Sequence, residues 1–383
     1  MRVASQAGLA GAWSLAWDWL FRLRDRILSS PRFQRWAARF PLTRPIARHR
    51  ASALFDLCAG FVYSQVLYAC VRVGLFDALA AGPQTVEELA PRLGLHPERA
   101  LRLLDAASSL RLTQRRSGGR YGLGIHGASL IGNPAVARMV EHHALLYRDL
   151  ADPVALLRGQ QDRTELGRFW SYAGHGPSVA PTQAQVAEYS SLMAGSLSLI
   201  AQDILEAYPM DRHRRLLDVG GGEGAFVEAA GTHTPGLALV LFDLPAVAAR
   251  ARDRLAHAGL GDRAAAIGGD VFCDPLPAGA DLASLVRVLH DHDDAQALAI
   301  LRAIRQALPP GGVLLVAEPM SGTAGAEPMG DAYFGFYLLA MGQGRPRTAA
   351  QLQALILEAG FSRVRPAKTR RPMLTQLLVA DVM

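Results

Sequence analysis

The sequence predicts an α/β protein in which a seven-stranded, Rossmann-like sheet follows an N-terminal helical region. The first observation is that, from Arg215 onward, short apolar runs alternate with helical stretches, as in a parallel sheet covered on both faces. The second is a glycine-rich loop, Gly220–Gly224, directly after the first of those runs. The third is a helix–turn–helix–hairpin pattern between residues 85 and 123. Together they predict two different structural regions in one chain.

The composition is that of a folded protein. The chain has 383 residues, half of them hydrophobic and 19% charged, which excludes a disordered or fibrous protein and allows two or three domains. Three widely spaced cysteines offer neither a disulfide framework nor a Cys-rich zinc site, which suits a reducing cytosol. No uncharged apolar run reaches the ~18 residues that a membrane helix needs. We therefore expect a cytoplasmic protein with no metal site.

Residues 1–50, called the arm below, differ from the rest of the chain in charge. They hold ten arginines against two aspartates, a net charge of +8, whereas the whole chain has a net charge of +6. They also hold four of the five tryptophans, interleaved with leucines. Apolar residues on one side of a helix and arginines on the other make a basic amphipathic segment.

Two interpretations of the arm are open. A basic amphipathic segment can lie in the headgroup layer of a membrane, with tryptophan at the interface and arginine on anionic lipid. It can also be a helical arm that packs on a partner subunit and leaves its arginines in water. The first interpretation predicts peripheral contact with the inner face of the membrane.

Residues 51–125 predict a compact helical unit that ends in a hairpin. Thr85-x-x-Glu88 is a capping box that begins a short helix, and residues 117–119 form the turn of the hairpin. The expected elements are a long apolar helix over 53–79 that is broken at Gly74, helices over 85–93 and 96–110, and two strands within 112–123.

Helix–turn–helix–hairpin is the pattern of a winged helix, which could bind DNA or form a dimer. A DNA-binding version would place the second helix in the major groove and the basic wing on phosphates. Here the unit is joined to a long apolar helix and is followed by enzyme-like motifs, which favours dimerisation. We therefore expect a winged-helix dimerisation domain, a homodimer and no nucleic-acid partner.

The rest of the chain divides into a helical connector over 126–210 and an α/β domain over 211–383. The connector ends in a long helix over 184–208. The strands expected in the α/β domain are 216–219, 237–242, 264–267, 282–289, 313–317, 363–367 and 374–380, with a helix over 348–359.

The loop over 218–225, with the sequence DVGGGEGA, joins the first strand to a helix. Its glycines let the backbone turn sharply, and the helix N-terminus beyond it offers unpaired N–H groups to a ligand. The spacing fits the dinucleotide-binding fingerprint G-x-G-x-x-A. In that fingerprint an acidic residue ~20 positions further on binds the ribose, and Asp243 lies at this distance. That ribose could belong to a nicotinamide cofactor or to adenosylmethionine.

Two later strand ends favour adenosylmethionine. Asp270 and Val271 could meet the amino group of an adenine with Phe272 beside the ring, although Asp270 could instead cap a turn. His290 ends an apolar strand and opens a helix. It therefore falls at the carboxyl edge of the sheet, where open α/β proteins bind ligands.

The ordered motifs over about 51–383 resemble the class I S-adenosylmethionine-dependent O-methyltransferases of the plant caffeic-acid and animal acetylserotonin type. These motifs are D-x-G-G-G-x-G at 218–224, F-D-L-P at 242–245, G-D at 269–270, L-H-D at 289–291, P-G-G at 310–312 and G-R-P-R-T at 344–348. Within that family the chain is most similar to the bacterial carotenoid enzymes that methylate hydroxyneurosporene. The segments that carry this similarity include P-R-F-Q-R-W-A at 31–37, F-P-L-T-R at 40–44 and H-H-x-x-L-Y-R-D-L at 142–150.

The resemblance implies S-adenosyl-L-methionine as cofactor and an acyclic hydroxylated carotenoid as substrate. By position, His290 matches the catalytic base of the family, and Glu318 matches an acid that orients it. The implied cofactor-binding residues are Asp218, Gly220, Asp243, Asp270, Val271 and Arg287. The side chains expected to line a cleft for a long apolar substrate are Met193, Met320, Met329, Phe334, Phe336, Tyr337 and Met341.

The chain departs from the family pattern at two positions. His292 stands where the family has tryptophan, and a second family acid would fall near Pro346, which has no carboxylate. The support of His290 then rests on Glu318, with Asp291 as a further candidate. Alternative functions are the same fold acting on a phenolic polyketide or a tetrapyrrole, a nicotinamide enzyme, and a winged-helix transcription regulator.

Overall fold

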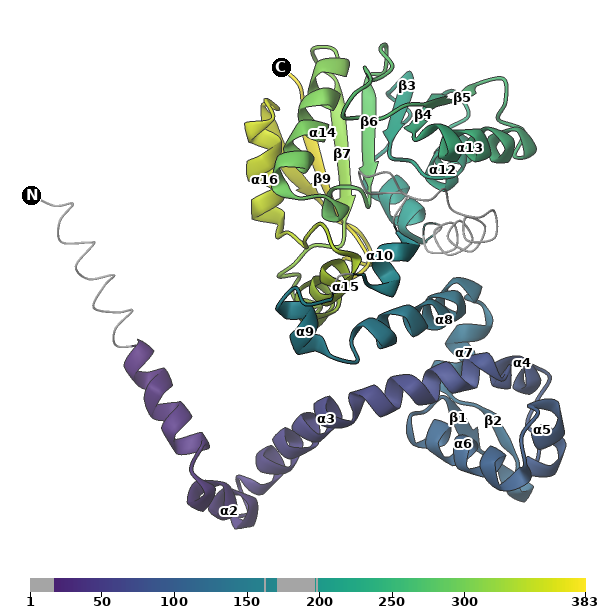
Figure 1. Ribbon diagram of the computed structural model, residues 1–383, viewed down its shortest axis with the longest axis vertical. Helices are drawn as coiled ribbons and strands as arrows, with labels where there is room; N and C mark the ends of the chain where they lie inside the picture. Colours follow the sequence, from purple (N-terminus) through teal and green to yellow (C-terminus); the bar gives the residue numbers. More distant parts are fainter. Residues whose placement is uncertain (1–16, 162, 171–196, 198) are drawn as a thin grey trace, which may run out of the picture. The chain divides into compact units, whose positions relative to one another are not determined.

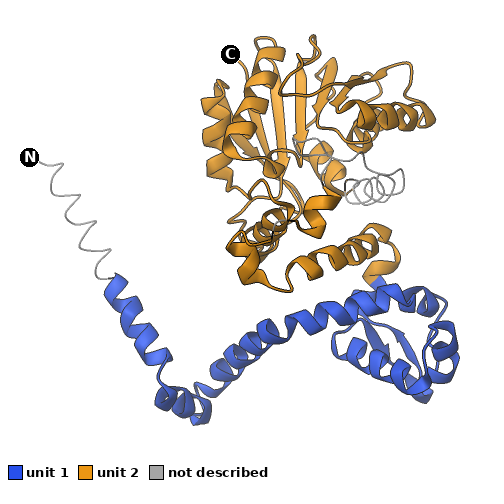
Figure 2. Cartoon of the chain, in the orientation of Figure 1, with its two compact units in different colours: residues 1–128 blue, residues 129–383 orange. Residues whose placement is uncertain are grey.

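The computed structural model describes residues 17–161, 163–170, 197 and 199–383 (Figure 1). The chain forms two compact units, Met1–Ala128 and Ser129–Met383, which are described separately (Figure 2). Most of the helix predicted over 184–208, including Met193, lies outside the described residues, while residues 199–207 are helical.

Unit 1 begins with three consecutive helices. Residues 17–28 are helical, α2 spans Pro31–Arg39, and α3 spans Arg44–Arg72. Because α3 runs through residue 50 without a break, the arm and the helical unit that follows share one helix. The predicted break of the apolar helix is confirmed, because Gly74 adopts a left-handed conformation (φ +70°) between α3 and α4 (Leu75–Ala80).

The rest of unit 1 has the predicted winged-helix order. The helices are α5 (Val86–Arg92) and α6 (Pro97–Ser109), and the antiparallel strands are β1 (Thr113–Arg115) and β2 (Tyr121–Leu123). The capping box of α5 is confirmed. The backbone N–H of Glu88 donates to Thr85 Oγ1 at 3.3 Å, and the backbone N–H of Thr85 donates to Glu88 Oε2 at 2.7 Å.

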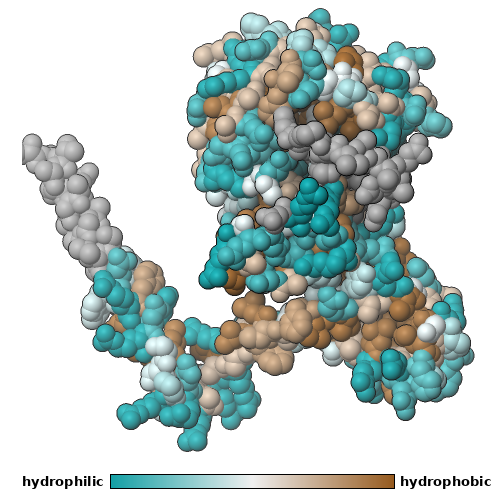
Figure 3. Space-filling model, in the orientation of Figure 1, coloured by the Kyte–Doolittle hydropathy of each residue, from teal (hydrophilic) through white to brown (hydrophobic). Residues whose placement is uncertain are grey.

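Helix α3 exposes a long apolar surface, which is brown in Figure 3. Leu54, Phe55, Leu57 and Phe61 on this helix are 64–81% exposed. By length and composition alone, α3 could cross a membrane: its most apolar 18-residue window has a mean hydropathy of 1.5, and only 6% of that window is buried. Asp56 interrupts the apolar run. A continuous exposed apolar surface is typical of an interaction site.

Four helices within residues 125–169 lead into unit 2, and three of them pack against α15 (Phe334–Met341). The four are α7 (Ile125–Ile131), which starts at the end of unit 1, α8 (Pro134–Asp149), α9 (Pro153–Leu157) and α10 (Glu165–Phe169). Leu146, Leu156 and Leu166, from α8, α9 and α10, form one apolar cluster with Leu338 and Met341 of α15.

The sheet of unit 2 has seven strands, as predicted, and their order is β5-β4-β3-β6-β7-β9-β8. The neighbouring strands β5, β4, β3, β6 and β7 run parallel to one another, and β9 is antiparallel to both β7 and β8. The strands are β3 (Arg215–Val219), β4 (Ala238–Asp243), β5 (Ala264–Gly268), β6 (Leu282–Val286), β7 (Val313–Glu318), β8 (Arg363–Ala367) and β9 (Gln376–Asp381).

Helices cover both faces of this sheet (Figure 1). Alternate residues of a strand point to opposite faces, so Leu216 packs with α12 (Ala225–His233) and α13 (Pro245–His257) on one side. Leu217 packs with α14 (Asp294–Ala307) and α16 (Ala349–Glu358) on the other side. The central strands β3, β4, β6 and β7 are therefore mostly apolar and buried, as the sequence indicates.

One predicted strand is too long. The apolar run 282–289 suggests a strand to Leu289, but β6 ends at Val286. Arg287 then adopts a left-handed conformation (φ +58°), and residues 289–291 form a turn of 3₁₀ helix. The chain leaves the sheet early here, and this early exit places the residues of the candidate site.

We predict that Thr85→Ala destabilises the protein toward urea by about 1 kcal/mol, because the backbone N–H of Glu88 loses its side-chain acceptor. Circular dichroism during urea denaturation measures this loss. Thr85→Ser keeps the hydroxyl and should retain most of the stability. An equal loss in both variants would contradict the capping role.

Candidate active site

A glycine loop at the carboxyl end of β3 forms one side of the candidate site. Gly220 has φ +68°, and a Cβ there would lie 2.9 Å from the side chain of Val288. Gly222 has φ +57°, and an added Cβ would meet nothing within 4 Å. Gly224 is the left-handed N-cap of α12. The loop therefore needs glycine for its turns and leaves open space beside Gly222.

Asp218 lies beneath this loop and is 1% exposed. Ser284 Oγ on β6 donates to its Oδ1 at 2.5 Å, whereas its Oδ2 has no hydrogen-bond partner among the described residues. Burial raises the pKa of Asp218 to about 7, against the lowering effect of the Ser284 hydrogen bond. A buried acceptor without a donor, directly below a glycine loop, fits a site that receives a ligand donor.

Asp243 at the end of β4 is tied to the same loop. Its Oδ2 accepts the backbone N–H of Gly222 at 2.8 Å, and its Oδ1 accepts that of Leu244 at 2.7 Å. Burial raises the pKa of Asp243 to about 6, although both backbone donors and the Arg250 cation lower it. A carboxylate fixed in this way, with further lone pairs available, fits the paired hydroxyls of a ribose.

Asp270 and Val271 follow β5, at the next strand end. The Asp270 carboxylate accepts the backbone N–H of Phe272 at 2.9 Å, so the alternative role of Asp270, capping a turn, is present in the structure. Val271 packs in part against the core cluster below it. The contact of these two residues with an adenine stays a prediction.

His290 lies in the 3₁₀ turn after β6 and is 7% exposed. Its Nδ1–H donates to Glu318 Oε2 at the end of β7. Its Nε2 lies 3.2 Å from Asp291 Oδ1. The edge of the His290 ring also faces Phe334, with 5.9 Å between ring centroids. The imidazole is therefore held on several sides.

Glu318 accepts three N–H groups through its two oxygens. Its Oε1 accepts the backbone N–H groups of Val288 at 3.0 Å and Leu289 at 2.7 Å, while Oε2 accepts His290 Nδ1–H. The carboxylate is 1% exposed. It therefore fixes both the backbone entering the turn and the ring orientation of His290, which confirms that the two residues predicted as catalytic lie in contact.

The electrostatic surroundings favour the charged form of His290. Burial alone would lower its pKa, but the carboxylates of Asp291 and Glu318 outweigh burial and raise the pKa above its usual value. Burial raises the pKa of Asp291 itself. With Nδ1–H donated to Glu318, neutral His290 carries its lone pair on Nε2. Nε2 is thus the atom that can accept a proton.

Arg287 lies where the chain turns out of β6. Its backbone N–H donates to Ala317 O at 2.8 Å. Burial raises the pKa of Asp291 and of Tyr333, and the positive charge of Arg287 acts against both rises, which indicates that the guanidinium lies near these groups. Contact of Arg287 with a cofactor stays a prediction.

Three neighbouring aromatic side chains, called the wall below, are Tyr333, Phe334 and Tyr337, and Phe334 faces His290. A turn of π-helix over Pro328–Tyr333 leads directly into α15, and such turns are common at functional sites. Tyr333 Oη bonds His143 Nε2 at 2.8 Å, and Tyr337 Oη bonds His142 Nε2 at 2.7 Å. These two bonds tie α8 to the wall.

The histidine pair on α8 is thus used for packing. Burial lowers the pKa of His142 to about 4, so it is neutral at physiological pH. Trp170 Nε1 also donates to Tyr337 Oη, at 2.9 Å. No group of three or more metal-ligating side chains occurs within the part of the chain that the structure describes.

Of the residues predicted to line a substrate cleft, one lies next to His290 and others are buried in the core. Phe334 faces His290, whereas Tyr337 and Met341 are buried in the apolar cluster that α15 forms with α8, α9 and α10. Met320 is 2% exposed and packs in the core of the sheet domain. Sequence reasoning missed Ser284 as the donor to Asp218, although a serine within an apolar strand is an unusual feature that could have indicated it.

We predict that Glu318→Gln lowers the pKa of His290, because a neutral amide no longer favours the imidazolium. A pH titration of ¹⁵N-histidine-labelled protein by NMR measures the change. Asp291→Asn should shift the pKa in the same direction. An unchanged pKa in both variants would show that the carboxylates do not control His290.

Comparison with protein families gives two matches along the chain. Residues 147–362 match the O-methyltransferase domain, and residues 55–130 match the O-methyltransferase dimerisation domain. The chain is 46% identical to the demethylspheroidene O-methyltransferase of Cereibacter sphaeroides over 94% of this chain and 95% of that protein. It is 34% identical to the acetylserotonin O-methyltransferase of Mus musculus, over 84% and 86% of the two chains.

Solved structures agree with these matches. The crystal structure of human N-acetylserotonin methyltransferase in complex with SAM has a TM-score of 0.72 and 25% sequence identity, and covers 87% of this chain and 97% of that chain. The candidate site lies within the matched O-methyltransferase domain. The chain therefore belongs to the O-methyltransferase family, and it carries both the methyltransferase domain and the dimerisation domain of that family.

Proposed function

We propose that this enzyme transfers the methyl group of S-adenosyl-L-methionine to a hydroxyl of an acyclic hydroxylated carotenoid, with His290 as general base. The observation that carries the substrate class is the similarity over nearly the whole chain to a demethylspheroidene O-methyltransferase. A second protein of that name, from Rhodobacter capsulatus, is 40% identical over 93% of this chain.

The cofactor would lie across the strand ends described above. Asp243 would accept the ribose hydroxyls, and the glycine loop with Asp218 would face the methionine part. Asp270, Val271 and Arg287 complete the proposed set. In support, the space beside Gly222 is open, and the acceptor at Asp218 lacks a donor among the described residues. When bound, this cofactor supplies an electrophilic methyl group on a sulfonium.

The residues of this chain contribute placement and proton transfer. The substrate oxygen must lie in line with the methyl carbon and the sulfur, and such placement can be worth ~7–11 kcal/mol. His290 Nε2 takes the hydroxyl proton as the C–O bond forms. General base catalysis of this kind typically raises the reaction rate ~10²–10⁴-fold. Glu318 stabilises the resulting imidazolium through Nδ1. Because a protonated imidazole cannot act as a base, turnover should rise as the pH rises through the pKa of His290.

The substrate class affects when the proton moves. An aliphatic hydroxyl of a carotenoid is far less acidic than a phenol, so proton removal lags behind methyl transfer. The imidazolium forms late, and its neighbours Asp291 and Glu318 favour that charge. The aromatic wall around Phe334 suits a long apolar chain next to this polar centre.

We predict that purified enzyme with S-adenosylmethionine converts a hydroxylated acyclic carotenoid into a product heavier by one methyl group in place of hydrogen, detected by mass spectrometry. Phenolic polyketides and tetrapyrroles in the same panel should give no product. Methylation of a phenol with no carotenoid product would contradict the proposed substrate.

Two variants separate chemistry from cofactor binding in this assay. His290→Ala should lower turnover by ~10²-fold or more while cofactor affinity stays nearly unchanged. Asp243→Ala should weaken adenosylhomocysteine binding in calorimetry, since each lost charge-assisted bond is worth ~1.5–3 kcal/mol. Unchanged turnover in His290→Ala would remove the base role, and an affinity change below about twofold in Asp243→Ala would remove the ribose role.

The proposed assembly is a homodimer formed through unit 1. The dimerisation-domain match covers 55–130, and the exposed apolar residues Leu57 and Phe61 of α3 lie within it. A partner subunit on α3 would cover this surface. We propose four segments in the chain, namely the arm over 1–50, the dimerisation domain over 51–125, the helical connector over 126–210 and the methyltransferase domain over 211–383.

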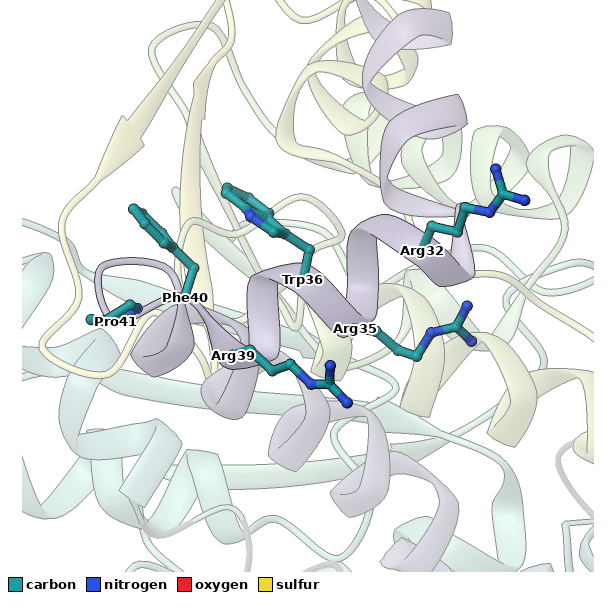
Figure 4. Close-up of a pocket in the computed structure, with 6 residues that line it drawn as sticks. All are labelled: Arg32, Arg35, Trp36, Arg39, Phe40 and Pro41. Atoms are coloured by element: carbon teal, nitrogen blue, oxygen red, sulfur yellow. The ribbon is translucent and has the colours of Figure 1, made fainter.

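We further propose that the arm of this cytoplasmic enzyme contacts the inner face of the membrane, where its carotenoid substrate dissolves. Arg32, Arg35 and Arg39 lie along one side of α2, whereas Trp36 and Phe40 extend from another side (Figure 4). The two aromatic rings stack with 5.0 Å between their centroids, and Trp36 is 50% exposed. Exposed aromatic rings beside arginines suit the interface of an anionic bilayer.

We predict that replacing Arg32, Arg35 and Arg39 together with glutamine weakens binding to phosphatidylglycerol vesicles by up to about 10²-fold, from ~1 kcal/mol per arginine near the surface. Vesicle sedimentation measures the binding. The same charge removal at three exposed arginines of unit 2, Arg158, Arg212 and Arg363, is the control and should have little effect. If both triple variants bind as the wild type does, or if the α2 variant dissociates the dimer instead, the arm is a packing element.

A further inference from the structure

The backbone of the His290 turn is held from outside by the segment Gly344–Arg347. Arg347 is 2% exposed, although it carries a guanidinium. It donates to Leu289 O at 2.6 Å and to His292 O at 2.7 Å, on either side of His290. Its Nε donates to Asp294 Oδ1 at 2.8 Å, which balances the buried charge.

The same segment also contacts the carbonyl of His290 itself. The backbone N–H of Arg345 donates to His290 O at 3.0 Å. Gly344 lies so close that a Cβ on it would come within 2.2 Å of that oxygen. The carbonyls of Leu289, His290 and His292 therefore all accept hydrogen bonds from two residues of this segment, Arg345 and Arg347, which lie more than fifty positions further along the chain.

These contacts complement those of Glu318. The carboxylate of Glu318 holds two backbone N–H groups and the ring Nδ1 from the sheet side. Arg345 and Arg347 hold the carbonyls from the other side. A three-residue 3₁₀ turn has few internal hydrogen bonds, so its geometry depends on such external partners. An acceptor on one side and two donors on the other leave the His290 ring little freedom to tilt.

The segment also follows directly from the apolar wall. Helix α15 ends at Met341, and Gly344 comes three residues later. The wall residue Phe334 contacts the His290 ring, while the segment after the same helix contacts the His290 backbone. The position of the base is thus linked to the position of the wall that would hold the substrate.

We propose that Gly344–Arg347 is a positioning element for His290, a second support beside Glu318 that aligns Nε2 with the substrate hydroxyl. Pro346 offers no side-chain donor or acceptor within this segment, and the backbone N–H of Arg345 with the guanidinium of Arg347 supplies the support instead. This proposal rests on the proposed role of His290 as general base. The element acts through His290 and does not touch the reacting atoms.

The test compares two glycines of one loop. Gly344→Ala forces a Cβ against His290 O, whereas Gly342→Ala has a similarly left-handed backbone (φ +90° against φ +80°) with nothing within 4 Å of the added Cβ. We expect Gly344→Ala to lower kcat by about ten- to a hundredfold, since small misplacements have effects of this size. Adenosylhomocysteine affinity should stay within about twofold in both variants, and kcat should be nearly unchanged in Gly342→Ala.

An NMR titration of His290 measures its pKa, which a general loss of stability would not change. The pKa of His290 should change in Gly344→Ala and stay at the wild-type value in Gly342→Ala. Equal losses of kcat in the two variants, or no loss in either, would overturn the proposal. If thermal denaturation shows that Gly344→Ala is unfolded, Arg347→Lys replaces it, because lysine keeps the charge near Asp294 but cannot reach both carbonyls.

Failure of this proposal can be distinguished from failure of the proposed function. His290→Ala is measured in the same assay. If its turnover equals that of the wild type, the base role is wrong whatever the glycine variants show. If His290→Ala is impaired while Gly344→Ala and Arg347→Lys keep full kcat, only the positioning role is wrong.

Discussion

The carboxylate of Glu318 is the interaction on which the rest of the site depends. It joins the end of β7 to the backbone that leaves β6 and to the ring of His290, through three N–H donors and two oxygens. Because it is almost fully buried, its loss would leave three donors unpaired in the protein interior, where each unpaired group costs ~1–3 kcal/mol. The same bond to Nδ1 leaves Nε2 as the basic atom and stabilises the ring when it becomes charged.

The parallel sheet brings the other groups to this carboxylate. Asp218, Asp243 and Glu318 end three strands that lie in one sheet, and the order of those strands places their carboxyl ends along a single edge. The aromatic wall comes from α15 and the π-helical turn before it. Helices α8 and α10 pack against α15, and two histidines of α8 hydrogen-bond the tyrosines Tyr333 and Tyr337. Hydrogen bonds and packing therefore hold both the strand ends and the wall in place, and in-line methyl transfer depends on such placement.

Much of the fold could be predicted from local patterns. The capping box at Thr85, the break at Gly74 and the apolar strands depend on neighbours in sequence, and the structure confirms them. The end of β6 could not be predicted, because the apolar run continues while Arg287 adopts a left-handed conformation that nothing in its own sequence requires. The contacts of the buried Arg347 could not be predicted from the sequence either, because its partners lie more than fifty residues away and only folding brings them together.

The central claim is that Glu318 fixes the tautomer of His290 so that Nε2 is the base. The most direct measurement is ¹⁵N NMR of histidine-labelled wild-type enzyme with adenosylhomocysteine bound, at a pH above the pKa of His290. The account predicts a protonated Nδ1 and an unprotonated Nε2, together with a strongly downfield Nδ1 proton from its bond to Glu318. A His290 ring protonated on Nε2, or a mixture of the two neutral tautomers, would contradict it.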